Sequence, residues 1–211
     1  MNEIIELYDE MLNRLIIAAE YRDTDVPKHI IRIKLYSEWL SRELKMSQDF
    51  IESIKFAAAL HDIGKIGIPY DILFKQGGLS REEFVAIKNH SQIGANILEG
   101  SNNSRIQMAA SIALNHHERC DGSGYPNGIK KNTIPIEAKI VTICDQYDAL
   151  MMKKPYKPSY GHKKSLEIIT KGDGRTLPQH FDQDVLSAFK KIAGEFESIF
   201  NTYQDLNDDI I

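Results

Sequence analysis

The sequence lacks the features that mark disulfide-linked, zinc-ribbon or membrane-spanning proteins. Its two cysteines, Cys120 and Cys144, are far apart and form no C-x-x-C motif, so neither a disulfide framework nor a zinc ribbon is indicated. Nowhere do about eighteen apolar residues follow one another, and the start is acidic where a signal peptide needs positive charge. We therefore expect an unanchored protein of the reducing cytoplasm that makes no membrane contact.

A surplus of positive charge is also missing. The formal net charge of the 211 residues is −4, whereas proteins that bind nucleic-acid polymers need a concentrated positive field. General nucleic-acid binding is therefore excluded, although local basic pockets remain open. The length and a hydrophobic content of 42% suit one well-buried domain with short additional elements.

No segment shows the period-two alternation of a β-strand, and apolar residues recur instead at intervals of three and four. The pattern predicts an all-α domain over residues 21–200, preceded by an amphipathic helix over 1–20 and followed by an acidic tail over 201–211. The first helix is a candidate contact in a homodimer. Within the domain we expect helices from Pro27, from about Ser47 to His61, from Ser80 to Leu98, and over residues 105–115, 135–152, 163–170 and 182–200.

The chain has only seven histidines, and five of them belong to a pattern that includes acidic residues. The pattern consists of His29, the pair His61–Asp62, His90, the pair His116–His117 and, further on, Asp145. A single histidine is more often a core or surface residue than a ligand. The pairs, however, interrupt apolar helical runs, and burying such polar groups without a partner costs a few kcal/mol each. Because imidazole and carboxylate bind borderline divalent metals, we predict that these segments converge on a metal cluster.

Two long motifs, HDIGKIGIP (His61–Pro69) and HHERCDGSGYP (His116–Pro126), resemble those of the HD-GYP family, a branch of the HD-domain metal phosphohydrolases. The resemblance extends from about Tyr21 to Phe200 and includes DQYDAL (Asp145–Leu150). It implies an HD-domain helical bundle. It also implies a role in bacterial signalling, in which two or three iron or manganese ions support hydrolysis of cyclic di-GMP to linear pGpG or onward to GMP.

Carried over position by position, the resemblance implies metal ligands at His29, His61, Asp62, His90, His116, His117 and Asp145. Asp62 is the expected bridge between two ions. Asp25 stands where the family has a glutamate for a third ion, and because aspartate is shorter, Asp25 is either a ligand or a helix cap. A donor set without cysteine favours iron or manganese over structural zinc, and a pair of such ions can neutralise phosphodiester charge during in-line attack.

The resemblance also implies catalytic and substrate-binding residues. Lys65 matches a family lysine that contacts phosphate or the leaving group, so Asp62 and Lys65 are the expected catalytic residues. Lys154 and Lys157 stand where the family has Arg-x-x-Lys, and a lysine binds phosphate as a point charge rather than as a fork. Gly124 and Tyr125 resemble a loop that borders the guanine pocket and can dock GGDEF-domain proteins.

Two alternatives stay open beside a cyclic di-GMP phosphodiesterase. A hydrolase of another cyclic dinucleotide would use the same metals, because base selection depends on loops. A catalytically weak sensor of cyclic dinucleotides, or a docking module for GGDEF partners, would be marked by the loss of a metal ligand. Every core ligand position is occupied by histidine or aspartate, which favours an enzyme.

Overall fold

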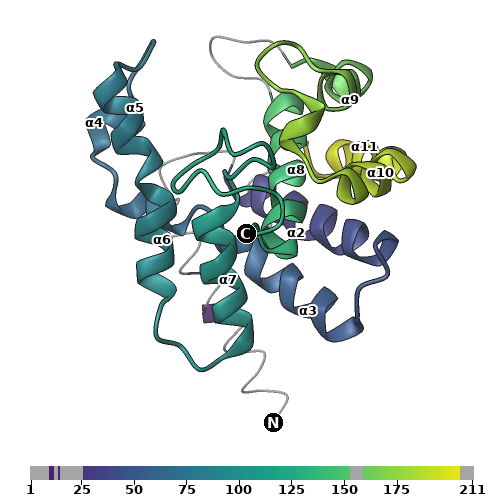
Figure 1. Ribbon diagram of the computed structural model, residues 1–211, viewed down its shortest axis with the longest axis horizontal. Coiled ribbons are helices and arrows are strands. Elements are labelled where there is room, and N and C mark those ends of the chain that lie inside the picture. Colours follow the sequence, from purple (N-terminus) through teal and green to yellow (C-terminus); the bar gives the residue numbers. More distant parts are fainter. Residues whose placement is uncertain (1–9, 12–13, 15–25, 153–158, 205–211) are drawn as a thin grey trace.

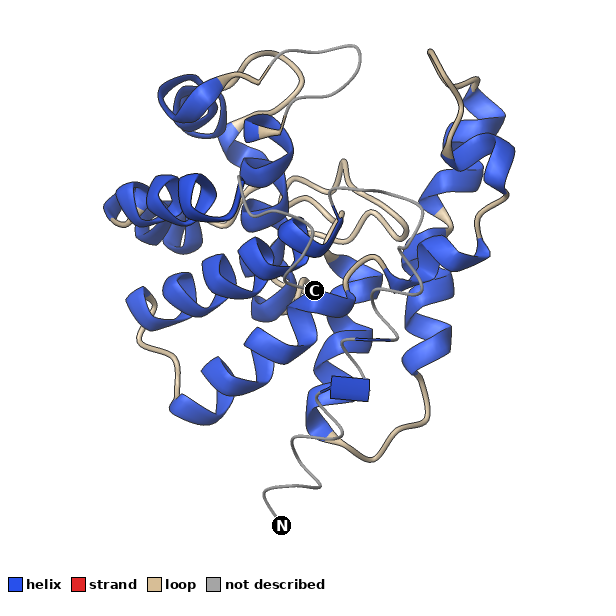
Figure 2. Cartoon of the chain, turned by 180° about the vertical axis from the view of Figure 1, so that it is seen from behind, coloured by secondary structure: helices blue, strands red, loops and turns tan. Residues whose placement is uncertain are grey.

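The computed structural model describes residues 10–11, 14, 26–152 and 159–204, and these residues form helices and loops without a strand (Figures 1 and 2). The predicted all-α class is therefore confirmed. The α-helices are α2 (Val26–Glu43), α3 (Gln48–Ala57), α4 (Tyr70–Leu73), α5 (Arg81–Lys88), α6 (His90–Leu98), α7 (Ser104–Asn115), α8 (Ile136–Met151), α9 (Gly161–Lys171), α10 (Gln183–Lys191) and α11 (Ala193–Gln204). Three 3-10 helices lie between them, η1 (Ala58–Leu60), η2 (Ile63–Gly67) and η3 (Pro178–His180).

The core forms where α2 and α8 pack against each other and against their neighbours. Helix α2 contacts α3, α8 and α11, and α7 contacts α3, α6 and α8. Tyr36 of α2 is fully buried, and its ring stacks on Phe196 of α11 at a centroid distance of 4.3 Å. Burying a large apolar side chain contributes about 1.5–3 kcal/mol, and packing of this kind holds helices that are too short to be stable alone.

A capping box formed by Ser80 and Glu83 begins α5. Ser80 Oγ accepts a hydrogen bond from the Glu83 backbone N–H at 3.2 Å, and a Glu83 carboxylate oxygen accepts one from the Ser80 N–H at 2.7 Å. Two of the donors left without partners at the helix start are thereby satisfied.

Three predicted helices are interrupted in the structure. The helix expected from Ser80 to Leu98 is two helices that meet at Asn89, whose N–H bonds back only three residues to the Ala86 carbonyl. The stretch expected over 182–200 is broken at Ile192, where the backbone leaves the helical region with φ −109° and ψ 19°. The helix expected to reach His61 tightens after Ala57 into η1.

The two ends of the chain fall largely outside the described residues. Of the predicted helix over 1–20, residues 10, 11 and 14 are described and helical. The predicted tail begins inside α11, which extends to Gln204, and residues 205–211 lie outside the described part. Among the described residues, no helix is both long and apolar enough to cross a bilayer.

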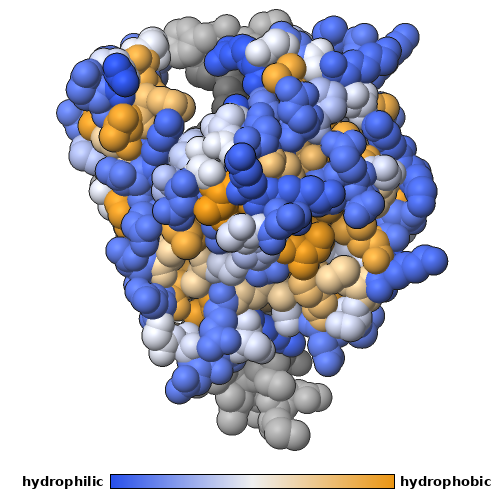
Figure 3. Space-filling model, in the orientation of Figure 1, coloured by the Kyte–Doolittle hydropathy of each residue, from blue (hydrophilic) through white to orange (hydrophobic). Residues whose placement is uncertain are grey.

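Helices α4 and α5 form an arm that projects from the body, at the upper left of Figure 1. Hydrophobic atoms appear on this arm among hydrophilic ones in Figure 3, and Phe84 and Val85 of α5 are 47% and 53% exposed. The arm leads directly into α6 at His90, one of the expected metal ligands.

Candidate metal centre

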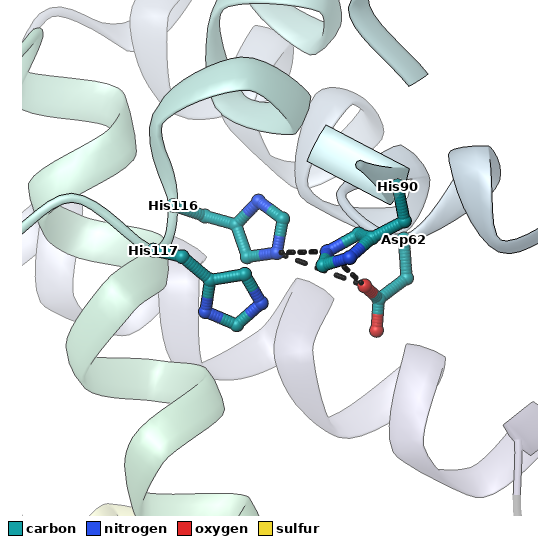
Figure 4. A group of neighbouring side chains, drawn as sticks. All are labelled: Asp62, His90, His116 and His117. Carbon is teal, nitrogen blue, oxygen red and sulfur yellow. Dashed lines mark hydrogen bonds and ion pairs between the residues drawn. The ribbon is translucent and has the colours of Figure 1, made fainter. Parts of the chain in front are cut away.

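The fold brings all seven expected core ligands together in two adjoining groups. Asp62, His90, His116 and His117 form the first, and His29, His61 and Asp145 form the second. Within each group the possible ligand atoms lie within 4.8 Å of one another. Figure 4 shows His90 and His116 pointing toward Asp62, with His117 beside His116. The groups adjoin because the Nε2 atom of His61 lies 3.4 Å from that of His29 and 3.2 Å from Asp62 Oδ2.

Five helical segments supply these side chains. His29 lies near the start of α2 and Asp145 in the middle of α8, whereas His116 and His117 follow the end of α7. His61 and Asp62 occupy the turn between η1 and η2. Gly64 of η2 is required next to this turn, because a Cβ atom at position 64 would lie 1.9 Å from the backbone oxygen of His90. The missing side chain lets α6 pack directly on the backbone of η2, which follows the His61–Asp62 turn.

Backbone carbonyls fix the Nδ1 side of three of the imidazole rings. The Nδ1 atoms concerned are those of His61, 2.9 Å from the Ala58 oxygen, His90, 2.7 Å from the Ile87 oxygen, and His116, 3.0 Å from the Ile112 oxygen. Because a carbonyl only accepts hydrogen bonds, each Nδ1 carries a proton, and in the neutral form of such a ring the Nε2 atom carries none. These Nε2 atoms all point into the centre.

A buried ion pair fixes a fourth imidazole ring, that of His29. Asp148 is fully buried, and its Oδ2 lies 2.8 Å from His29 Nδ1 while Arg32 donates to both carboxylate oxygens at 2.6 and 2.8 Å. Burial alone would raise the pKa of Asp148, but hydrogen bonds from Arg32 and His29 outweigh it and hold the pKa below its usual range. Asp148 therefore stays charged and keeps the His29 Nε2 atom free to bind a ligand.

The arrangement fits divalent cations. The Nε2 atoms of His90 and His116 are 3.5 Å apart, and two unprotonated nitrogens facing each other at this distance repel unless a cation lies between them. Asp62 is buried, and its Oδ1 accepts no hydrogen bond from any described residue, although His90 Nε2 is only 3.2 Å away. A buried carboxylate oxygen and convergent imidazole lone pairs are what a borderline metal requires.

Electrostatics keep the donors in the protonation states that bind metal. Burial raises the pKa of Asp62, but the Lys65 ammonium, 2.5 Å from its Oδ2, and His61 hold that pKa well below its usual range. Burial lowers the pKa of His90 to about 4, against the opposing attraction of Asp62. Burial and the neighbouring His116 likewise hold the pKa of His117 well below its usual range. At neutral pH the carboxylate is charged and these two imidazoles are neutral.

Tyr125 forms one wall of the centre. Its ring lies 4.7 Å from that of His117 and 6.4 Å from that of His90, centroid to centroid. Gly124 must lack a side chain here, since a Cβ atom would lie 2.3 Å from the Arg119 backbone nitrogen. Both residues of the predicted substrate loop therefore lie beside the metal centre.

Glu118, to which the sequence pattern assigned no role, holds this loop in place. The carboxylate is buried and accepts three backbone N–H groups, from Asn127 at 2.7 Å, Gly128 at 3.1 Å and Ile129 at 3.1 Å. The available signal was the third consecutive polar residue in His116–His117–Glu118 at the end of an apolar helix. The roles of Asp148 and Arg32 were also missed, although Asp148 follows Asp145 by three residues on α8 and so shares its side of the helix.

Three of the expected site residues cannot be placed. Asp25, Lys154 and Lys157 lie outside the described residues. The third metal and the basic phosphate-binding pair therefore stay predictions.

Comparison with known proteins defines the class. The family model for the HD domain matches residues 4–185, and the chain belongs to this family. It is 41% identical over 196 residues to a cyclic di-GMP phosphodiesterase of Thermotoga maritima, covering 93% of this chain and 52% of that protein. It is 39% identical to the cyclic di-GMP phosphodiesterase response regulator RpfG of Xanthomonas campestris, covering 94% and 52%. The suspected HD-GYP relationship is thereby confirmed.

A further relative differs in its named substrate. The 3'3'-cGAMP-specific phosphodiesterase 2 of Vibrio cholerae is 34% identical, covering 94% of this chain and 37% of that protein. The chain spans about half the length of the first two relatives, at 52% of each. Among solved structures, an HDG"Y"P protein from Bdellovibrio bacteriovorus matches with a TM-score of 0.64 at 16% identity, covering 90% of this chain and 64% of that one. That similarity supports the helical fold.

Proposed function

We propose that this chain is the hydrolytic domain of a metal-dependent phosphodiesterase that hydrolyses cyclic di-GMP to linear pGpG or onward to GMP. The observation that carries the proposal is the buried Asp62, whose Oδ1 accepts no hydrogen bond from described residues and faces the Nε2 atoms of His90 and His116. The names of the relatives from Thermotoga and Xanthomonas support the substrate.

Divalent ions held by the two groups would act as Lewis acids on a phosphodiester and neutralise its charge. Iron or manganese suits the donors best, since imidazole and carboxylate are present without thiolate. In the proposed reaction water adds to phosphorus, the bond from phosphorus to the 3′ oxygen breaks, and a proton reaches the departing oxygen. The proposed role of Lys65 is to contact the phosphate or that oxygen, and the ion pair of its ammonium with Asp62 supports this role.

The finer parts of the proposal concern setting and partners. The free Cys120 and Cys144 suit a reducing cytoplasm. The Tyr125 loop is the proposed docking surface for GGDEF-domain proteins, and residues 1–20 are the proposed contact of a homodimer. Asp25 as a ligand of a third ion, and Lys154 and Lys157 as phosphate-binding residues, complete the proposed site.

The second candidate is hydrolysis of 3'3'-cGAMP, which the name of the Vibrio relative favours. The two candidate reactions share the chemistry at the metals, and their substrates differ only in one base. A sensor without turnover fits less well, because both donor groups are complete among the described residues.

The test is turnover by protein purified without chelating resin and kept anaerobic, with its metal content measured by elemental analysis. We expect iron or manganese at about two or three ions per chain and conversion of cyclic di-GMP to pGpG or onward to GMP, with 3'3'-cGAMP and cyclic di-AMP assayed in parallel. Preference for 3'3'-cGAMP would replace the first candidate with the second. Full metal occupancy without hydrolysis of any cyclic dinucleotide would refute both and favour the sensor.

A further inference from the structure

Lys88, the last residue of α5, holds its ammonium between two aromatic rings at the edge of the metal centre. Its Nζ lies 4.7 Å from the ring centroid of Phe84 and 5.2 Å from that of Tyr125. Lys88 is half-buried, yet it forms no ion pair with any carboxylate in the described part of the chain. Within the described part of the chain, this cation therefore lies against the two ring faces.

The position of Lys88 connects it to the candidate centre. Tyr125, which Lys88 contacts on one side, lies against His117 at a centroid distance of 4.7 Å. Lys88 also precedes His90 by two residues, at the point where the α4–α5 arm joins α6 (Figure 1). The ring of Tyr125 would thus be what separates this ammonium from an anion bound over the metal ligands.

Two other cations near the centre, among the residues that the structure describes, are already engaged. Lys65 is ion-paired with Asp62, and Arg119 donates to Ser123 Oγ at 3.5 Å within its own loop. A ring face attracts an ammonium ion more weakly than an anionic oxygen does. Lys88 can therefore exchange its ring contacts for a phosphate oxygen, and the flexible lysine stem allows the movement.

A cyclic dinucleotide carries two phosphodiester groups, and only one of them can lie over the metal ligands. We propose that Lys88 binds the second, non-reacting phosphodiester of the substrate. This inference rests on the proposed function. Phe84 and Tyr125 hold the ammonium in position when the substrate is absent. This arrangement explains why Phe84 is 47% exposed, because its ring is one of the two that contact the Lys88 ammonium.

The experiment compares a substrate that has two phosphodiesters with one that has a single phosphodiester. Turnover of cyclic di-GMP and of bis(p-nitrophenyl) phosphate is measured for the metal-loaded parent, Lys88→Met and Lys88→Arg, and calorimetry gives the affinity for cyclic di-GMP. Arg81→Met is the matched control, since it removes one positive charge from the exposed first turn of the same helix. Metal content and melting temperature are recorded for each protein.

We expect Lys88→Met to raise the KM for cyclic di-GMP by about 10-fold or more while kcat stays within about twofold. Affinity should fall in parallel, and the change should shrink at high salt. Turnover of bis(p-nitrophenyl) phosphate and metal content should stay at parental values. Lys88→Arg should recover most of the affinity, and Arg81→Met should behave like the parent.

Two results would overturn the assignment of Lys88. One is an unchanged KM and affinity for cyclic di-GMP in Lys88→Met, and the other is an equal loss on both substrates with a lower melting temperature, which is the mark of a structural role. If the parent fails to hydrolyse cyclic di-GMP but binds it, the proposed function fails while the calorimetric comparison still decides the role of Lys88. A parent that binds no cyclic di-GMP overturns both.

Discussion

Asp62 is the residue on which the centre depends most, because it lies between the two donor groups. His61 Nε2 is 3.2 Å from its Oδ2, and His90 Nε2 is 3.2 Å from its Oδ1. No other carboxylate among the described residues occupies the first group. A carboxylate placed in this way can serve two ions, and no neighbouring side chain can replace both bonds.

We predict that Asp62→Ala keeps its helical structure but loses metal and turnover. The expected fall in turnover is at least about 100-fold, since even outer-shell changes at metal sites cost about 10–100-fold. Circular dichroism, elemental analysis and the cyclic di-GMP assay measure the three quantities. Retained hydrolysis at full metal occupancy would show that Asp62 is not the bridging ligand.

Asp148 gives a second prediction at this scale, because it both orients His29 and neutralises the buried Arg32. Asp148→Asn should weaken metal affinity by about 10–100-fold and lower the free energy of unfolding by about 3–5 kcal/mol, since Arg32 is left charged and buried. Urea unfolding and metal titration measure the two effects. The matched control is Asp184→Asn on the exposed side of α10, and equal effects in both variants would contradict the role assigned to Asp148.

The pKa of His90 leads to a pH prediction for the metal-free protein. The value is lowered from 6.5 to about 4, so between these pH values the unfolded chain binds a proton at this residue that the folded chain does not. The stability of the apoprotein should therefore fall as the pH drops from 6.5 toward 4, by about 1.4 kcal/mol per pH unit for this group. Chemical unfolding in EDTA measures how the free energy of unfolding depends on pH across this range. In His90→Gln the slope of that dependence should be smaller than in the parent by about the contribution of one proton. An unchanged slope would mean that His90 titrates normally.

At the scale of the elements, the centre requires close packing between α6 and the η1–η2 turn. Gly64 makes this contact possible, since an added Cβ would lie 1.9 Å from the His90 oxygen and 2.4 Å from the Gly94 nitrogen. Both neighbours are backbone atoms, which cannot rotate away. The packing of these two elements thus sets where His90 stands relative to Asp62.

We predict that Gly64→Ala lowers the free energy of unfolding by more than about 3 kcal/mol, because the helix must shift as a whole, and that metal content falls with it. Gly194→Ala is the control, because nothing lies near the position of its added Cβ in α11. That substitution should stabilise by about 0.5–1 kcal/mol. Thermal and urea unfolding of the two variants should give effects of opposite sign.

The sequence reveals the elements and ligands that a local pattern or a contiguous motif encodes. The Ser80–Glu83 capping box, the helices around His29 and Asp145, and the His61–Asp62 pair are all of this kind. The breaks at Asn89 and Ile192 could not be predicted, because the apolar periodicity continues through both and only tertiary packing decides them. Glu118 was missed for a related reason, since its partners are backbone N–H groups about ten residues away, whose positions no residue type reveals.

At the scale of the whole molecule, two complete donor groups adjoin within one helical domain. Ions that bind the folded chain and not the unfolded chain stabilise it by mass action, by about 2.7 kcal/mol per site at 100 times the dissociation constant. We predict that EDTA lowers the melting temperature and that manganese restores it, as differential scanning calorimetry would measure. A melting temperature independent of both would contradict a resident metal.

Metal count is the remaining prediction at this scale. Elemental analysis of the parent and of Asp25→Ala should give near three and near two ions if Asp25 is a ligand. Two ions in both proteins would mean that Asp25 caps the start of α2 and that the centre is dinuclear.

The seven expected ligands are spread along the chain from His29 to Asp145, and no two consecutive helices hold a complete donor group. Contacts between residues so distant in sequence form late in folding, because the intervening chain must first be closed into loops. During synthesis the full set of donors cannot assemble until α8 has left the ribosome. Binding of metal by both donor groups therefore requires the complete long-range topology, and a chain stalled before Asp145 would lack a ligand of the second group.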